Sequence, residues 1–255
     1  MALFPYLVWG CGECLLAGLI LRSRKIGLFS RYQYFCSYVL SVFCSGVIKV
    51  CLALSKTNAQ VFAKVSWSLE VVTVLLGFGV TWEILRQTLL PYPGVRKMAR
   101  TVLLVVFAAI LLNALIQLSD SPIRNLVPTT RELDRNLRVV QALFLMTLAG
   151  LVVHYRIPLG RNLWSMLIGY GLLVGTGVIT FTLSSRFDQV AWKWWAIPIQ
   201  LEYCATLTIW CAGMWSYAPN PLPGSALELD YQRISAQTTR AVSRLREHLI
   251  EPWSD

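Results

Sequence analysis

Charged residues are scarce in this chain. Asp, Glu, Lys and Arg make up only 14% of its 255 residues, whereas 56% are hydrophobic, and the mean hydropathy is +0.56. A soluble domain of this length needs far more polar surface to cover it. The composition therefore argues against an ordinary soluble protein and predicts a membrane protein, whose solvent is lipid.

Histidine and the signatures of cofactor-binding loops are also nearly absent. The two histidines, His154 and His248, lie far apart in the sequence, which fits neither a zinc site nor a bis-histidine haem. No Gly-rich phosphate loop or RNA-binding motif accompanies the excess of 23 basic over 13 acidic residues. We expect no metal, no cofactor, no enzymatic activity and no nucleic-acid partner.

Long apolar runs are abundant instead. A helix that spans the bilayer needs about 20 mostly apolar residues. The N-terminal run has neither a basic region before it nor a small-residue cleavage site after it, so we expect it to be retained as a helix. The sequence predicts an all-α domain over residues 1–217 with transmembrane helices at about 4–21, 32–54, 62–86, 101–118, 137–155, 163–183 and 194–216.

Basic residues mark one set of the loops between these helices. Loops 22–31, 87–100 and 156–162 contain basic but no acidic residues, whereas loops 119–136 and 184–193 contain both. Lys and Arg concentrate in cytoplasmic loops. We therefore expect a multi-pass protein of the bacterial inner membrane, with its N-terminus outside and its C-terminus in the cytoplasm.

A Pro-rich break, "APNPLPG", follows the last predicted helix and indicates a linker over residues 218–225. Beyond it, apolar residues recur at helical spacing, which predicts a cytoplasmic amphipathic helix and tail over residues 226–255. That helix either packs on the loops and the lipid surface, or binds a second copy or another membrane protein through residues 226–250.

Three pairs of segments match each other at an offset of 131–132 residues. "LLAGLILRSR" at 15–24 aligns with "TLAGLVVHYR" at 147–156, "SGVIKVCL" with "TGVITFTL", and "LEVVTVL" with "LEYCATL". The matches link the first three predicted helices to the last three in order. We interpret them as parallel three-helix repeats joined by the fourth helix.

This three-plus-one-plus-three plan resembles sugar transporters of the SWEET type and vitamin transporters of the PnuC type. The Pro-Gln pair expected early in each SWEET repeat is missing here. Seven-helix rhodopsins share the helix count, but Glu202 lies where a retinal protein needs lysine. The resemblance is architectural and implies a fold, not a substrate.

A local resemblance lies in "GFGVTWEILRQTLLPYPGVRK", residues 77–97. Its Glu-x-x-Arg followed by Pro-Tyr-Pro and basic residues is similar to a group of uncharacterised bacterial seven-helix integral membrane proteins, and this implies the topology alone. Glu83 and Arg86 lie three residues apart on one face at the inner end of the third predicted helix. They predict an interfacial ion pair that anchors the helix, or an inner gate.

Four charged residues lie at membrane depth in the outer half of the predicted helices, where each costs about 2.5–3.5 kcal/mol on insertion scales. Glu13, Lys49, Glu70 and Glu202 all lie roughly 8–14 Å below the outer surface, at 1.5 Å per residue. They form either a polar network that fixes helix packing, or an outward-opening cavity for a cation, proton or small cationic solute. The candidate lining residues are Asn113, Gln141, Tyr170, Thr180 and Tyr203.

Seven cysteines all lie within predicted helices, including the pair in "CGEC", Cys11 and Cys14. A membrane thiol oxidoreductase needs a second pair in an outer loop, and none occurs there, so we expect inert cysteines. The leading hypothesis is a protein that binds or transports a small solute, ion or proton through the outer polar cavity. The alternative is a non-transporting scaffold, sensor or accessory subunit.

Overall fold

The computed structural model describes residues 3–55, 57–120, 122–154, 156–184 and 189–221, together with positions 236 and 240. Over this part of the chain the long elements are all helices and no strand occurs, which confirms the predicted all-α class. The helices are α1 (Leu3–Lys25), α2 (Leu28–Arg31), α3 (Gln33–Leu54), α4 (Ala59–Thr88), α5 (Pro93–Asp120), α6 (Pro122–His154), α7 (Arg161–Ser184) and α8 (Gln189–Met214).

Five of these helices contain segments long and apolar enough to cross a membrane: Gln33–Leu54, Ala59–Thr88, Ala99–Ile116, Leu133–His154 and Arg161–Thr180. The chain is thus a membrane protein by the length and composition of its helices. Spans by α1 and α8, and the orientation, stay predictions. The predicted tail, residues 226–255, lies outside the described residues apart from positions 236 and 240.

Two helix starts differ from the sequence prediction by eight or more residues, and α8 begins five residues earlier than expected, at Gln189 instead of 194. The fourth expected helix began at residue 101, but α5 begins at Pro93; the fifth began at 137, but α6 begins at Pro122. Both missed segments are rich in polar and basic residues. An apolar run in the sequence marks only the part of a helix that is covered by lipid or by the protein core. The polar first turns of α5 and α6 were therefore predicted to be loops.

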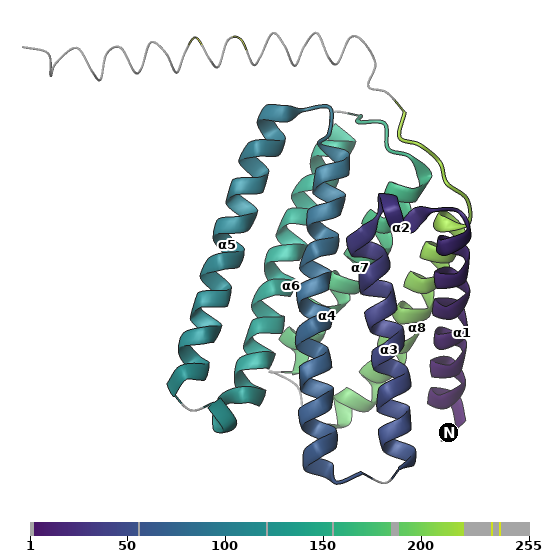
Figure 1. Ribbon diagram of the computed structural model, residues 1–255, viewed down its shortest axis with the longest axis vertical. Coiled ribbons are helices and arrows are strands. Elements are labelled where there is room, and N and C mark those ends of the chain that lie inside the picture. Colours follow the sequence, from purple (N-terminus) through teal and green to yellow (C-terminus); the bar gives the residue numbers. More distant parts are fainter. Residues whose placement is uncertain are drawn as a thin grey trace, which may run out of the picture.

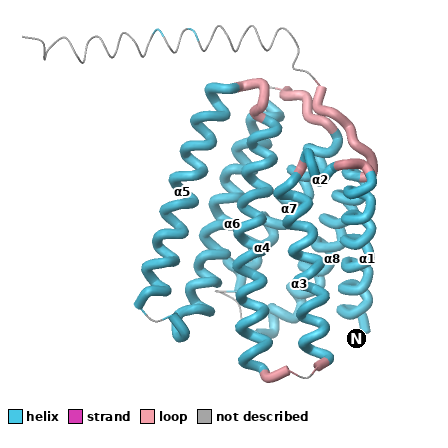
Figure 2. Tube along the Cα trace, viewed as in Figure 1, coloured by secondary structure: helices cyan, strands magenta, loops and turns pink. Residues whose placement is uncertain are grey.

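Contacts between neighbours join six long helices into a closed ring. In order around the ring, α1 packs on α3, α3 on α4, α4 on α6, α6 on α7, α7 on α8, and α8 on α1. Figure 1 shows α3 and α4 in front and α7 and α8 behind them. Helix α5 lies outside the ring, mainly against α6, and α2 is one turn between α1 and α3. Figure 2 shows the described connections gathered at the two ends of the bundle.

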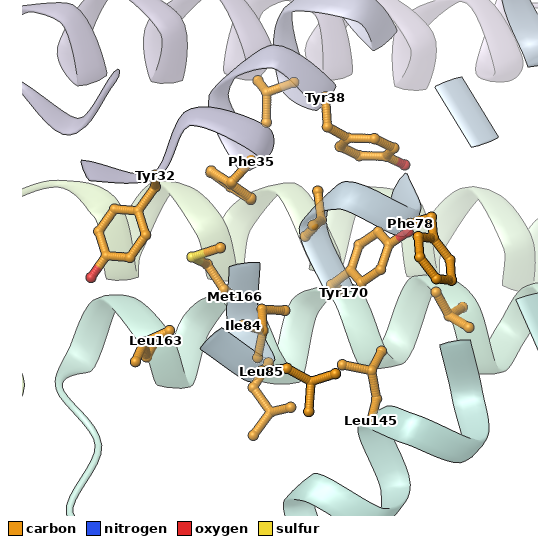
Figure 3. Packing of buried hydrophobic residues seen from close by; sticks show 14 of the residues in the cluster. Tyr32, Phe35, Tyr38, Phe78, Ile84, Leu85, Leu145, Leu163, Met166 and Tyr170 are labelled. Carbon is orange, nitrogen blue, oxygen red and sulfur yellow. The ribbon is translucent and has the colours of Figure 1, made fainter. Parts of the chain in front are cut away.

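In four helices of this ring, burial is concentrated in one half. The buried residues of α3 lie between positions 35 and 45, those of α4 between 74 and 88, those of α7 between 162 and 174, and those of α8 between 206 and 214. Because neighbouring helices run in opposite directions, these segments share one end. Figure 3 shows part of this core, including Phe35, Tyr38, Ile84, Met166 and Tyr170.

In the opposite half these four helices are loosely packed, whereas α6 is buried there at Leu133, Asp134 and Leu137. None of the described side chains is buried in the remaining part of the same four helices, at 46–54, 59–73, 175–180 and 197–205. We call these halves the tight half and the loose half. In the predicted orientation the tight half is cytoplasmic and the loose half is outer.

Polar contacts fix the end of α8 in the tight half. Asn162, fully buried, donates from Nδ2 to the carbonyls of Gly213 (2.9 Å) and Ser216 (3.0 Å), and its Oδ1 accepts the Ala218 N–H at 2.6 Å. Arg22 Nε donates to the Trp215 carbonyl at 2.9 Å. Carbonyls at a helix C-terminus lack helical partners, so these donors stabilise it.

Candidate functional site

A cavity of about 480 Å³ opens in the loose half between α1, α4, α6, α7 and α8. Its polar surface comes from carboxylates, one guanidinium, hydroxyls and an amide, set among apolar side chains. Three carboxylates and one guanidinium therefore share its lining. The lining residues are Val8, Trp9, Glu70, Asp134, Arg138, Leu173, Thr176, Gly177, Thr180, Ile199, Gln200, Glu202 and Tyr203.

Arg138 of α6 is the cation of this cavity. Its Nε donates to Asp134 Oδ1 at 2.7 Å, one helical turn away, and its Nη2 lies 3.7 Å from Glu70 Oε1 on α4. On the other side of Glu70, Oε2 lies 3.8 Å from Lys49 Nζ on α3. Glu70 therefore connects three helices through charge.

Gly177 on α7 makes room for the Arg138 side chain. A Cβ at this position would lie 2.9 Å from Arg138 Nη1 and 3.0 Å from its Cδ. Real Cβ atoms rarely come so near another heavy atom, so any larger residue here would displace the guanidinium. The absence of a side chain at Gly177 is thus part of how the charged cluster is built.

Glu202 on α8 has a different environment. Its Oε1 accepts a hydrogen bond from the Thr206 hydroxyl at 2.9 Å. Within the described residues, no Lys, Arg or His forms an ion pair with its carboxylate. One turn earlier, Pro198 lacks a backbone N–H, which removes one helical hydrogen bond beside the lining residues Ile199 and Gln200.

Of the four charged residues predicted to share one depth, the structure brings only three together. Glu70 and Glu202 line the cavity, and Lys49 contacts Glu70. Glu13 is not among the lining residues. Its carboxylate packs against Gly46 of α3, and its Oε2 is buried with no hydrogen-bond partner among the described residues.

Only two of the five predicted lining residues line the cavity. Thr180 and Tyr203 line the cavity. Gln141 and Tyr170 instead lie buried in the core, where the Tyr170 hydroxyl donates to Gln141 Oε1 at 3.4 Å. Asn113 is exposed on α5, outside the ring. These three side chains are displaced from the expected site because depth in a helix does not define which face the residue occupies.

Sequence reasoning missed Asp134 and Arg138. Both belong to "ELDRNLRVVQ", where an acid and a base four residues apart are the spacing of an ion pair on one helix face. That signal was present, but the stretch was assigned to an outer loop and to the first turn of the next helix. With α6 beginning at Pro122, the pair lies well inside a helix.

The predicted ion pair between Glu83 and Arg86 is not formed. Glu83 is buried, and its carboxylate accepts the backbone N–H of Phe35 at 2.8 Å and of Tyr34 at 3.4 Å, in the first turn of α3. Helix α3 has no side-chain cap from its own N-cap residue. Glu83 therefore caps a neighbouring helix, and a carboxylate is suited to this place because the N-terminus carries partial positive charge. Arg86 is exposed.

The cysteines are all free thiols, and Cys11 and Cys14 are exposed on α1. Cys36 is the buried one, in the tight half. Cys44 and Cys51 on α3 are also exposed. The expectation of buried cysteines is therefore wrong for these four residues, while their inertness stays a prediction.

Comparison of the chain with protein-family models, with curated proteins and with solved structures finds no match in any of the three. The resemblance to bacterial seven-helix proteins and the analogy with SWEET and PnuC transporters therefore stay predictions.

Proposed function

We propose that this chain binds and moves a small cationic solute, an ion or a proton through the cavity in the loose half. The observation that carries the proposal is the convergence of Glu70, Asp134 and Glu202, from three different helices, on one cavity with a single guanidinium, Arg138. Charged groups at membrane depth are costly and mark pathways for ions and solutes. An excess of carboxylates favours a cation.

The packing of the ring supports access from one side. The cavity lies in the half where helices are loosely packed, whereas aromatic residues fill the other half. Tyr38 meets Tyr170 edge to face at 5.6 Å between ring centroids, and Phe35 meets Trp210 in the same way at 5.1 Å. Movement through the protein would require these rings to part, as in alternating access.

The order of helices in the ring supports the proposed duplication. If α1, α3 and α4 correspond to α6, α7 and α8, each contact within the first set has its counterpart in the second. The contact of α1 with α8 likewise corresponds to that of α6 with α4. Glu70 and Glu202 are equivalent under this exchange, and both line the cavity.

Purified protein in liposomes tests the proposal. Currents would be recorded after concentration jumps of small inorganic and organic cations, and a trapped pH dye would report proton movement. Glu202→Gln is the sharpest variant because the new amide oxygen keeps an acceptor for Thr206 while the charge is lost. We expect it to abolish the response, and Glu70→Gln to do the same.

Glu13→Gln is the matched control. It removes the same charge from the same half of the bundle, but from a residue that does not line the cavity. We expect the response to persist in this variant. Equal flux in wild type, Glu70→Gln and Glu202→Gln would remove the mechanism and favour the non-transporting alternative.

A further inference from the structure

A second and larger cavity, of about 800 Å³, lies in the tight half at the end where α4 connects to α5 (Figure 1). Residues of α3, α4 and α5 line it, among them Arg86, Arg96, Lys97 and Arg100. No carboxylate is among the lining residues, and within the described chain none forms an ion pair with these four cations. The cavity is therefore strongly positive.

The nearest acidic residue in sequence is engaged elsewhere. Glu83 lies one turn from Arg86 on α4, but it is buried and its oxygens accept backbone N–H groups of α3. Arg86 acts on Glu83 through charge but forms no salt bridge with it among the described contacts, and its side chain lines the cavity. Arg100 lies over the ring of Trp82, at 5.5 Å from the centroid, so part of the wall combines a cation with an aromatic face.

The depth of the cavity matches the headgroup layer of a bilayer. One apolar span ends at Thr88 and the next begins at Ala99. Arg86 lies within the last turn of the first span, while Arg96 and Lys97 directly precede the second. The lining also includes Leu85 and Leu89 beside the cations. Apolar and positive surfaces therefore adjoin in this cavity, as the acyl chains and the phosphate group adjoin in a phospholipid.

We propose that this cavity binds the phosphate group of an anionic phospholipid, with the acyl chains along the apolar wall. Basic pockets between helices at the cytoplasmic face suit anionic headgroups, and Arg is suited to phosphate because its guanidinium can make two parallel hydrogen bonds. The proposal is independent of the transport function, because the two cavities lie in opposite halves of the ring. In this proposal, Arg96 and Lys97, which follow the Pro-Tyr-Pro segment, bind the lipid phosphate.

Delipidated full-length protein in neutral detergent tests the proposal. Dioleoyl phosphatidylglycerol or zwitterionic dioleoyl phosphatidylcholine is added, and bound lipid is counted by native mass spectrometry. We expect wild type to retain phosphatidylglycerol in preference to phosphatidylcholine. Arg96→Gln/Lys97→Gln should weaken phosphatidylglycerol binding by about 10- to 30-fold, with an unchanged thermal midpoint because neither side chain has a partner among the described residues.

Arg24→Gln/Lys25→Gln is the matched control. It also removes one Arg and one Lys at the same end of the bundle, from exposed positions on α1 outside the cavity. We expect it to bind phosphatidylglycerol like wild type. Equal losses in the two double variants, or no preference for the anionic lipid, would overturn the proposal.

Inorganic pyrophosphate provides the second arm and is titrated by calorimetry without lipid. Weak or absent binding supports the lipid assignment. Tight binding that only Arg96→Gln/Lys97→Gln loses, together with no lipid preference, would keep the phosphate site but assign it to a soluble phosphate. That result would overturn the lipid as its ligand.

Discussion

Glu70 and Glu202 occupy corresponding positions in the proposed repeats, yet their partners differ. Glu70 lies 3.8 Å from Lys49 and 3.7 Å from Arg138, so much of its charge is balanced. Glu202 accepts the Thr206 hydroxyl at 2.9 Å. Among the described residues it forms no ion pair, although Arg138 acts on it through charge. Its charge is therefore less balanced than that of Glu70, and under the proposed function we expect Glu202 to contribute more to cation binding.

Glu83 allows a prediction that separates capping from ion pairing. Glu83→Gln replaces one acceptor oxygen by an NH₂ donor that faces the N–H groups of Tyr34 and Phe35. We expect the free energy of unfolding to fall by about 1–3 kcal/mol. Thermal or denaturant unfolding of the purified protein in detergent measures the change.

Arg86→Gln is the discriminating control for this capping role. The ion-pair hypothesis requires both substitutions to cost a similar amount, whereas the observed hydrogen bonds leave Arg86 out of the cap. We expect a change within about 0.5 kcal/mol, as for an exposed side chain that forms no salt bridge or hydrogen bond with the cap. Similar losses for Glu83→Gln and Arg86→Gln would refute the capping role.

Helix packing around the first cavity depends on the positions of glycines in α7. Gly175 and Gly177 are two residues apart on α7, but a Cβ at Gly175 would meet nothing within 4 Å, whereas one at Gly177 would crowd Arg138. The sequence alone does not distinguish the two glycines, but their surroundings in the structure differ. Helix α7 thus offers a matched pair of substitutions.

We expect Gly177→Ala and Gly175→Ala to have opposite effects. At Gly177 the guanidinium must shift, which disturbs its contact with Glu70 and lowers the free energy of unfolding by about 1 kcal/mol or more. At Gly175 the better helix propensity of alanine stabilises by up to about 1 kcal/mol. Unfolding midpoints of the two variants in the same detergent provide the measurement. Equal shifts would show that Arg138 is not held as described.

The sequence predicted which segments form helices better than where each helix begins or which of its side chains face the cavity. Each expected apolar run overlaps one long helix over most of its length, because burial in lipid or core requires a continuous apolar surface. The first turns of α6 were missed since Arg, Glu and Asp there resemble a loop by hydropathy. Asp134 and Arg138 were lost with them. The facing of Asn113 and Tyr170 could not be predicted either, because it depends on which helices are neighbours in the ring.

At the scale of the whole molecule, the basic connections share one end of the bundle. Arg22 bonds the carbonyl of Trp215, Arg161 bonds Ser216, and Arg31 stacks on the ring of Tyr217 at 3.9 Å from its centroid. Residues from two basic loops therefore meet the chain that leaves α8. The positive-inside rule predicts that this whole end, with the tight half and the basic cavity, is cytoplasmic.

Two exposed serines at opposite ends of the bundle test that orientation. Ser30 lies in α2 at the basic end, and Ser55 follows α3 at the other end. In a background with all seven native cysteines replaced by serine or alanine, we expect a membrane-impermeant maleimide to label Ser55→Cys in intact cells. Ser30→Cys should react only after the membrane is opened. The cavity with Glu70 and Glu202 would then face outward, as uptake of a cation from outside requires. Labelling of Ser30→Cys alone in intact cells would invert the orientation, and the acidic cavity would open to the cytoplasm.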